Sequence, residues 1–365
     1  MKIKVDEKIA EAAVLGGAFF GGGGGGDLRE GLKHAKLAIE LGEVVIVDVD
    51  SIPKDKYIAT ASMVGAPAAK EKYLLPVHAI KSTELFMNVA RVPLGGLISS
   101  ENGGYSTING WIQSAALGIP IVDAPANGRA HPAAVMGSMG LHKLPDYISI
   151  QTAVGGNKEK RMYTEVIVKG SLERAAKMIR EAAVQAGGLV AVTRNPVTPE
   201  YVKENAAVGA ISQAIEIGRI IQEYGSDVDQ MVEKIIGYLG GGKTIDKGEV
   251  EQATLETRGG FDVGKIIVKG STNKRYEATF WNEFMTLEDT EGKRYGTFPD
   301  LIVMVDLQTG LPLTSAEVKQ GDKVLLVVVP KEYLILGAGV KDPDVLKLVE
   351  QAIGKKSCLG RWIKC

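Results

Sequence analysis

The chain has 365 residues, 43 of them basic and 44 acidic, and its formal net charge at pH 7 is −1. This balance provides no basic field for nucleic acid or an anionic membrane, so we expect a small-molecule ligand. Both cysteines, Cys358 and Cys365, lie at the C-terminal end, which excludes a disulfide framework and a cysteine metal cluster and favours the cytoplasm. No apolar run reaches membrane-spanning length, so we expect no transmembrane helix.

Six consecutive glycines, Gly21 to Gly26, separate two segments with helical patterns. Asp6 is placed to cap a helix that ends near Phe19, and Asp27 a second helix that ends at Gly42. Ordering glycine costs more entropy than ordering any other residue, so the run indicates a backbone close to a ligand, unless it is a flexible linker. A dinucleotide-binding loop would follow a strand, which disfavours that interpretation. The candidate ligand-binding residues here are Gly23, Gly24, Gly25, Gly26 and Asp27.

Strand and helix patterns alternate along the first two thirds of the chain. Apolar strands are predicted at 43–50, 94–99 and 119–123, and a strand, a helix and a strand follow between 163 and 193. A helix rich in small residues, whose glycines indicate close packing, is predicted from 202 to 224. This alternation is typical of an α/β domain with a mostly parallel sheet.

The pattern changes after Gly240, where short β-branched runs separated by turn residues predict a second, smaller all-β domain. We therefore predict an α/β domain at 1–238, a β-rich domain at 239–330, and a C-terminal segment at 331–365 that returns to the α/β domain. The stretch 237–244 matches the sequence pattern of a phosphate-binding loop. It follows a helix and precedes strands, however, which indicates an interdomain hinge instead.

Polar side chains follow the predicted strands, at the edge where ligands of open α/β sheets bind. Glu101 and Asp123 are expected near one crevice, although they could be a solvated loop carboxylate and a turn cap. Gly103 and Gly104 leave backbone N–H groups free at the start of a helix, where such groups favour an anion or an oxyanion. Arg129 would clamp a substrate carbonyl or carboxylate, or form a structural ion pair. We take Glu101, Asp123 and Arg129 as candidate catalytic residues.

His131 is the only histidine in a candidate site segment. A divalent metal held by His131, Glu101 and Asp123 is possible, although no ligand spacing supports it, and no other cofactor is expected. Glu283 lies with Asn282 in an apolar, aromatic stretch, where a half-buried carboxylate needs a partner. Asn127, Gly128, His131, Asn282 and Glu283 join the candidate ligand-binding residues.

Several different short sequence signals follow one another along the chain. They are Gly21 to Asp27, Gly65 to Pro67 with Glu71 and Lys72, Glu101 with Gly103 and Gly104, Asp123 with Gly128 to Ala130 and Pro132, Gly209 to Arg219, Gly259 to Phe261, Asn282 with Glu283, and Pro299 with Asp300. No one of them is specific, but the ordered set resembles the S-methyl thiohydantoin desulfurase-like family, whose members are often associated with hydantoin utilisation. The resemblance covers about Ala13 to Val329. It implies an α/β N-terminal part, a β-rich C-terminal part and chemistry on cyclic amide or thioamide rings.

The chain departs from the family pattern after Asp123. Pro125 and Ala133 stand where the family tends to have carboxylates, and His131 stands where it tends to have Phe. The Asn that the family tends to have soon after the Gly-Gly pair is replaced by the stretch 105–107. The substrate and the reaction of this protein can therefore differ from those of its relatives.

Two functional hypotheses follow. The first is a hydrolase-like or lyase-like enzyme on a cyclic amide, hydantoin or thiohydantoin ring. Glu101 or Asp123 would be the general base, Arg129 would hold the substrate, and glycine N–H groups would stabilise an oxyanion. The second is a non-catalytic ligand-binding or regulatory subunit of a hydantoinase-type complex, which the lost carboxylates at Pro125 and Ala133 favour. In either case we expect a homo-oligomer.

Overall fold

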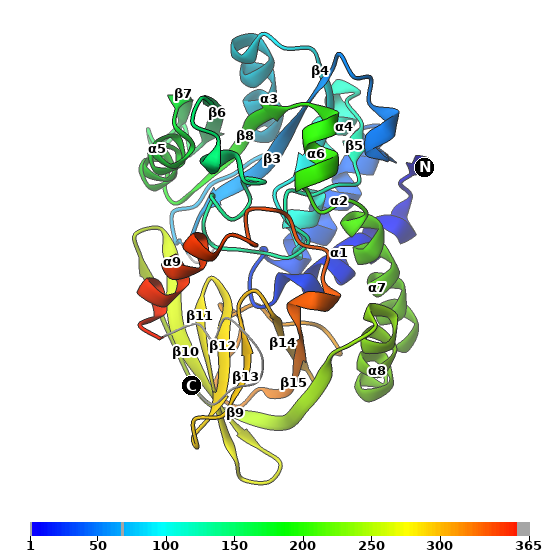
Figure 1. Ribbon diagram of the computed structural model, residues 1–365, viewed down its shortest axis with the longest axis vertical. Helices are drawn as coiled ribbons and strands as arrows, with labels where there is room; N and C mark the ends of the chain where they lie inside the picture. Colours follow the sequence, from blue (N-terminus) through cyan, green and yellow to red (C-terminus); the bar gives the residue numbers. More distant parts are fainter. Residues whose placement is uncertain (1, 67–68, 356–365) are drawn as a thin grey trace.

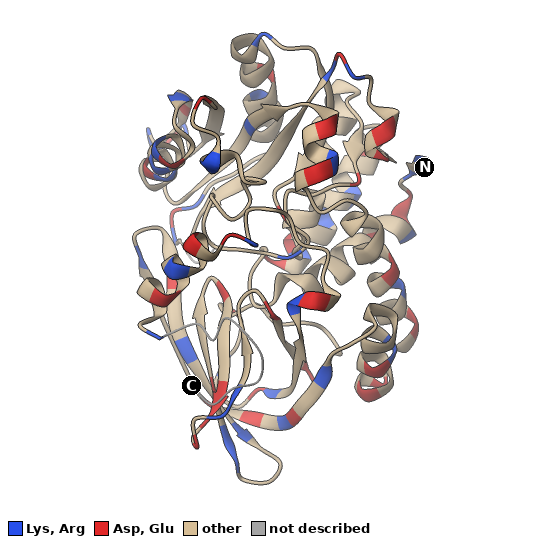
Figure 2. Cartoon of the chain, in the orientation of Figure 1, with Lys and Arg blue, Asp and Glu red and all other residues tan. Residues whose placement is uncertain are grey.

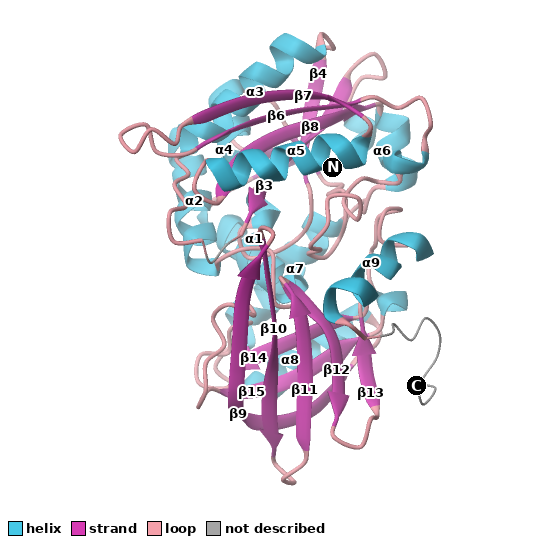
Figure 3. Cartoon of the chain, turned by 90° about the vertical axis from the view of Figure 1, so that its left-hand side faces the viewer, coloured by secondary structure: helices cyan, strands magenta, loops and turns pink. Residues whose placement is uncertain are grey.

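The computed structural model describes residues 2–66 and 69–355. It contains two β-sheets, one above the other, and most of the helices surround the upper sheet (Figure 1, Figure 3). Pro67, Cys358 and Cys365, which entered the sequence predictions, lie outside the described residues.

The α/β part precedes the β-rich part in the chain. Its strands are β1 (Lys2–Lys4), β2 (Val45–Val47), β3 (Tyr57–Gly65), β4 (Leu94–Ser99), β5 (Ile121–Val122), β6 (Ser149–Gly155), β7 (Thr164–Gly170) and β8 (Leu189–Val197). Its α-helices are α1 (Glu7–Gly21), α2 (Leu28–Leu41), α3 (Pro76–Ala90), α4 (Trp111–Leu117), α5 (Leu172–Gln185), α6 (Pro199–Asn205), α7 (Ala210–Tyr224) and α8 (Val228–Leu239). Short 3-10 helices are η1 (Val49–Ser51), η2 (Ser106–Ile108) and η3 (Leu141–Lys143).

These strands form one 8-stranded sheet in the order β1-β2-β5-β4-β3-β8-β6-β7. Strands β2, β5, β4 and β3 run parallel, whereas β1 at one edge and β8, β6 and β7 at the other pair antiparallel. The sheet is therefore mixed, and the expectation of a mostly parallel sheet is not confirmed. The predicted strand, helix and strand between 163 and 193 exist as β7, α5 and β8, but β6 lies between the two strands. The polar Ser149, Gln151 and Thr152 give β6 no uniform apolar run by which to predict it.

The glycine run joins two helices, as the sequence predicts. The Oδ1 atom of Asp6 accepts a hydrogen bond from the backbone N–H of Ile9 at 2.8 Å and caps α1. Asp27 caps α2 in the same way through the N–H of Glu30, also at 2.8 Å. Both predicted caps are confirmed, and they fix the two ends of the glycine loop.

The segment predicted as one helix from 202 to 224 forms two, α6 and α7. The chain breaks at Gly209, whose φ is +87° and whose N–H donates to the carbonyl oxygen of Asp123 at 2.8 Å. Helix α7 packs closely on α1, and a Cβ on Gly218 would lie 1.8 Å from the carbonyl oxygen of Ala12. The close packing expected from the glycines is confirmed.

The β-rich part is a 7-stranded antiparallel sheet in the order β13-β12-β11-β10-β9-β15-β14. The sheet is curled, so that the edge strand β14 also contacts β12 and β13. A separate all-β part is thus confirmed. Its strands are β9 (Lys243–Arg258), β10 (Phe261–Gly270), β11 (Arg275–Trp281), β12 (Glu283–Asp289), β13 (Arg294–Thr297), β14 (Leu301–Asp306) and β15 (Lys323–Val329), followed by the 3-10 helix η4 (Lys331–Tyr333) and by α9 (Pro343–Ile353).

The segment after β15 touches both parts. The backbone N–H of Gly337 donates to Oδ1 of Asn127 at 3.0 Å, in the α/β part. Helix α9 then packs on β11 of the β-rich sheet, in an apolar cluster that includes Trp281 and Leu346. The C-terminal segment therefore ties the two sheets together.

Basic and acidic side chains are interspersed over both parts (Figure 2), in keeping with the net charge of −1. Within residues 2–66 and 69–355, none of the helices combines the length and the apolar character needed to cross a bilayer.

Candidate active site

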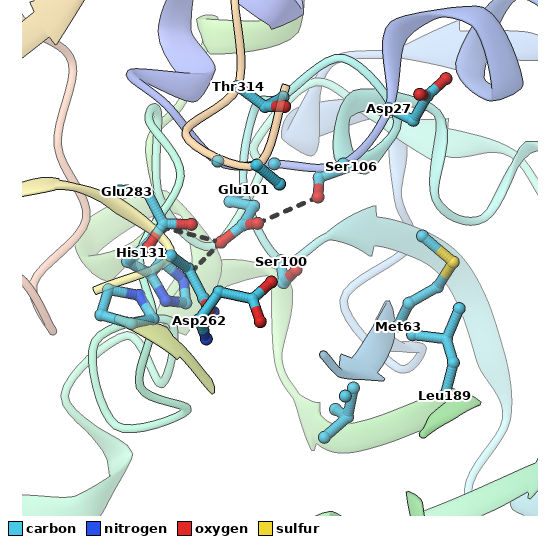
Figure 4. A pocket seen from close by; sticks show the side chains of 18 of the residues that line it. Asp27, Met63, Ser100, Glu101, Ser106, His131, Leu189, Asp262, Glu283 and Thr314 are labelled. Carbon is cyan, nitrogen blue, oxygen red and sulfur yellow. Dashed lines mark hydrogen bonds and ion pairs between the residues drawn. The ribbon is translucent and has the colours of Figure 1, made fainter. Parts of the chain in front are cut away.

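A cavity of about 190 Å³ lies between the two sheets, where the glycine loop meets the loop after β4 and the turns of the β-rich part (Figure 4). Met63 and Leu189 form an apolar wall, and carboxylates line the opposite side. Because both parts supply the walls, neither sheet carries this site alone. The predicted residues that line the cavity are Gly23, Gly24, Gly25, Gly26, Asp27, Glu101, His131, Asn282 and Glu283.

Glu101 follows β4 and is 8% exposed. Its Oε1 accepts a hydrogen bond from Oγ of Ser106 at 2.9 Å, and its Oε2 accepts one from the backbone N–H of His131 at 3.1 Å. Both donors favour the ionised form, but burial outweighs them and raises the pKa of Glu101 to about 7. A carboxylate with this pKa accepts and releases a proton readily near neutral pH.

Glu283 begins β12, directly after Asn282, whose φ of +58° turns the chain between β11 and β12. Its side chain is buried, and Oε2 has no hydrogen-bond partner in the described part of the chain. Burial, followed by the negative charge of Glu101, raises the pKa of Glu283 well above its usual value. The positive charge of Arg129 and the backbone N–H of Gly25 favour the ionised form of Glu283, but burial and the charge of Glu101 outweigh them.

Asn282 holds the turn before Glu283 in place. Its Oδ1 accepts a hydrogen bond from the backbone N–H of Asp262 at 2.9 Å, and its own N–H donates to the Asp262 carbonyl oxygen at 2.7 Å. The hydroxyl of Ser315 donates to the Asn282 carbonyl oxygen. The turn is thus fixed from two sides, which sets the direction of the Glu283 side chain.

The glycine loop packs closely against its neighbours on the sides that do not line the cavity. A Cβ on Gly24 would lie 2.0 Å from Oε1 of Glu283, and a Cβ on Gly25 would lie 2.4 Å from Cα of Gly103. The absence of side chains in this loop therefore leaves space for the Glu283 carboxylate and for the backbone at Gly103. Its carbonyl oxygens are also used: those of Gly22, Gly23 and Gly25 accept hydrogen bonds from the backbone N–H groups of Phe284, Ser315, Tyr105 and Ser106.

Gly103 and Gly104 lie behind the glycine loop and do not line the cavity. The N–H of Gly103 donates to Oγ1 of Thr107 at 3.0 Å, so this donor is already engaged. A Cβ on Gly104 would lie 3.0 Å from the carbonyl oxygen of Gly26. These two glycines support the loop, and their expected oxyanion role has no support in this geometry.

Asp123 also lies away from the cavity, and it caps α7. Its Oδ1 accepts hydrogen bonds from the backbone N–H groups of Ile211 and Ser212 at 2.8 and 3.2 Å, and its Oδ2 accepts one from Oγ of Ser212 at 2.5 Å. Burial raises the pKa of Asp123. The carboxylate therefore caps the start of a distant helix rather than the local turn that was the alternative from the sequence.

Arg129 is fully buried behind the carboxylates and does not line the cavity. Its Nη1 donates to the carbonyl oxygens of Pro299 and Asp300 at 3.2 and 2.5 Å, and its guanidinium lies 4.6 Å from the centroid of the Phe298 ring. It therefore reaches no ligand in the cavity directly. Its charge acts on Glu283 and Glu101 through space.

Asn127 and Gly128 hold the same loop against the C-terminal segment. Nδ2 of Asn127 donates to the carbonyl oxygen of Arg129 at 2.7 Å, while its Oδ1 accepts from Gly337. A Cβ on Gly128 would lie 1.9 Å from the carbonyl oxygen of Ile335. The structure gives both residues a packing role outside the cavity.

His131 contacts Glu101 directly, with Nε2 at 3.3 Å from Oε2. Burial, followed by the positive charge of Arg194, lowers the pKa of His131 to about 3, so the imidazole is neutral at physiological pH. Across residues 2–66 and 69–355, no three His, Cys, Asp or Glu side chains are arranged to hold a metal ion.

Two arginines in the cavity wall were not predicted. Arg194 on β8 is 4% exposed, and its Nε has no hydrogen-bond partner in the described part of the chain. Arg180 on α5 donates to the carbonyl oxygen of Gly260 at 2.8 Å and lies 3.9 Å from the centroid of the Phe261 ring. Burial lowers the pKa of each arginine to about 10, so both remain charged. Arg194 follows the apolar residues 189–192 within β8, which is a sequence signal for a buried charge, whereas Arg180 in an amphipathic helix gives none.

The comparisons with known proteins agree with this architecture. The S-Me-THD-like N-terminal domain matches residues 9–164, and the S-Me-THD-like C-terminal domain matches residues 170–336. The chain belongs to the S-methyl thiohydantoin desulfurase-like family. This confirms the resemblance inferred from the ordered motifs. Glu101 lies in the first of these domains and Glu283 in the second.

A protein from Chromobacterium violaceum, solved by X-ray crystallography in a structural genomics programme, shares this fold. The two chains are 19% identical, and the similarity covers 96% of each with a TM-score of 0.70. A search of curated proteins gave no match. The structural likeness therefore supports the fold, and the function rests on the site and the family.

Proposed function

We propose that this protein is an enzyme that acts on a small cyclic amide, a hydantoin or a thiohydantoin-like compound, by hydrolysis or desulfuration. The observation that carries the proposal is Glu101, a buried carboxylate in a cavity wall whose pKa is about 7. General base catalysis is most effective when the pKa of the base lies near the working pH. Membership of the S-Me-THD-like family supports hydantoin-related chemistry.

The size and the walls of the cavity suit a small ring. Its volume of about 190 Å³ is below the roughly 300–1,000 Å³ that is typical of clefts for larger ligands. One face of a flat ring would rest on Met63 and Leu189, while its other face would be turned towards the carboxylates. Such a position exposes a ring carbon to attack from the side of Glu101.

In the proposed reaction Glu101 takes a proton from water while the water oxygen bonds to an electrophilic ring carbon. The electron pair of the former double bond moves to its oxygen or nitrogen, which becomes negative. Arg194, a buried cation in the same wall, stabilises this developing charge. Arg194 thus takes the role first expected of Arg129, because Arg129 does not line the cavity.

The test is turnover of hydantoin and S-methyl thiohydantoin by the wild type and by Glu101→Gln, followed by the ultraviolet absorbance of the ring and by thiol release. Removal of a general base is expected to lower kcat about 100- to 10,000-fold. Glu249→Gln, which changes an exposed carboxylate on β9, is the matched control and should keep full activity. Undiminished turnover by Glu101→Gln would overturn the assignment.

The same assay separates the enzyme from the alternative of a ligand-binding subunit. A purified protein that binds these rings but turns them over only after a hydantoinase is added would favour the subunit. Self-association of the chain stays a prediction, and analytical ultracentrifugation tests it.

A further inference from the structure

Glu101 and Glu283 form a pair of buried carboxyl groups that face one cavity from different parts of the molecule (Figure 4). Glu101 comes from the loop after β4, and Glu283 from the first residue of β12. Two ionised carboxylates in such a setting repel each other, and little water is available to screen them. A pair of this kind holds a proton to higher pH than an isolated carboxyl group does.

The hydrogen bonds of the two carboxyl groups differ. Glu101 accepts from the hydroxyl of Ser106 and from the backbone N–H of His131, one donor on each oxygen. Such donors stabilise the ionised form. Glu283 differs, because its Oε2 is buried and has no hydrogen-bond partner in the described part of the chain. A bare oxygen of this kind favours the protonated form, whose O–H can donate into the cavity.

The charged groups that face Glu283 are consistent with this assignment. Glu101 raises the pKa of Glu283, while Arg129 behind the loop lowers it, and Arg180 on α5 interacts with it as well. Asp262 and Glu317 line the same cavity. Burial dominates this set, and the pKa of Glu283 is raised well above its usual value.

We propose that Glu283 is the acid of the site: it keeps its proton when Glu101 is ionised and delivers that proton to the leaving group. The inference rests on the proposed function, since it assigns a second catalytic residue to the same reaction.

The two carboxyl groups account for both proton transfers of the reaction. Glu101 removes one proton from water as the new carbon–oxygen bond forms. The electron pair on the negative oxygen or nitrogen then re-forms the double bond, while the bond from the same carbon to the ring nitrogen or to the sulfur substituent breaks and the leaving atom takes the proton from Oε2 of Glu283. The step ends with Glu101 protonated and Glu283 ionised. Transfer of one proton back, directly or through water, restores the starting state without an oxidant, a reductant or a further reactant.

The first experiment needs no turnover. Glutamate labelled with ¹³C at the side-chain carboxyl is incorporated, and the carboxyl signals are followed by NMR from acid to alkaline pH. The signals of the two residues are assigned by their loss in Glu101→Gln and Glu283→Gln, with Glu283→Asp as a second variant if Glu283→Gln does not fold. We expect Glu101 to titrate first and Glu283 at higher pH, and we expect the Glu283 pKa to fall in Glu101→Gln. Ionisation of Glu283 before Glu101 would overturn the inference and leave the proposed function intact.

The second experiment uses the leaving group. S-methyl thiohydantoin releases a basic thiolate that needs a proton, whereas an S-(para-nitrophenyl) analogue releases a stable thiolate that does not. Glu283→Gln is expected to lower kcat on the first compound about 100-fold or more, and to change kcat on the second much less. Equal losses on both compounds would show that Glu283 has a structural role only. Failure of Glu101→Gln to lose activity on either compound would instead contradict the proposed function.

Discussion

The carboxylate of Glu283 fills the space beside Gly24, and a Cβ on Gly24 would lie 2.0 Å from Oε1. Gly23 and Gly25 have φ values of +91° and +73°, which favour glycine, whereas the φ of Gly24 is not in this positive range. The backbone of Gly24 is open to other residues, so the constraint on this position is space. The glycine run and the buried carboxylate are therefore two halves of one packing arrangement.

Gly24→Ala should displace Glu283 and lower both activity and stability. Overpacking of this kind costs about 1–3 kcal/mol, which urea unfolding measures. Gly21→Ala is the matched control in the same run, because its Cβ would meet Cα of Gly103 at an ordinary 3.7 Å. In a double-mutant cycle, Gly24→Ala combined with Glu283→Ala should cost less than the sum of the single changes, since truncation of Glu283 vacates the space. Strict additivity would contradict the contact.

Asp123→Ala is expected to change stability without changing chemistry. Loss of a helix N-cap costs about 0.5–2 kcal/mol, and here the carboxylate caps α7 with both of its oxygens. Thermal unfolding should therefore shift downward, while kcat of the folded protein stays at the wild-type value. A loss of kcat with unchanged unfolding would return Asp123 to the catalytic set.

The pH dependence of activity should follow Glu101. As a base it must be ionised, so kcat/KM is expected to rise with pH through about 7. Glu101→Gln should abolish this acidic limb, and a profile that stays flat in the wild type would argue against the assignment.

Stability should change with pH in the opposite sense. The pKa of Glu101 is raised from 4.5 to about 7, so the folded protein holds a proton that the unfolded chain has lost between these values. The free energy of unfolding should therefore fall as pH rises from 4.5 to about 7, and the raised pKa of Glu283 adds to this fall and continues it to higher pH. Glu101→Gln removes the contribution of Glu101 and lowers the pKa of Glu283, so the decline should be shallower in this variant, although burial of Glu283 leaves part of it. Urea unfolding of the two proteins across this window provides the comparison, and parallel curves would contradict the raised pKa.

Gly16→Ala should weaken the contact of α1 with α7, because its Cβ would lie 1.7 Å from the carbonyl oxygen of Ala214. A destabilisation of about 1–3 kcal/mol or more is expected. Gly237 in α8 has open space around it, so Gly237→Ala should stabilise the protein by roughly 0.5–1 kcal/mol. Similar effects of the two changes would show that helix propensity, rather than packing, decides both.

The helix ends near the glycine run could be predicted because their signals are local. Asp6 and Asp27 each precede an amphipathic segment, and both cap a helix. The start of α7 could not be predicted, because small apolar residues continue the helical pattern of α6 across Gly209. This helix start needed a cap, and Asp123 supplies it from a distant loop.

The candidate site was predicted in part. Glu101 stood out by its position after a strand, and Glu283 by its charge in an aromatic stretch, and both line the cavity. Their proximity depends on how the two sheets pack, which no local pattern encodes. Arg129 carries the expected charge, but the direction of its side chain is set by the carbonyl oxygens of Pro299 and Asp300. A rule that places ligands at strand ends does not determine which way such side chains point.

The contact between Gly24 and Glu283 spans the two family domains and offers a way to sort relatives. A chain in which a larger residue replaces Gly24 has no room for this carboxylate, so the two positions should change together. Relatives that keep both the glycine and the glutamate should keep the acid–base pair, and those that lose both should use other chemistry in this cavity. Gly24 and Glu283, far apart in the sequence, would then together serve as a marker of the reaction.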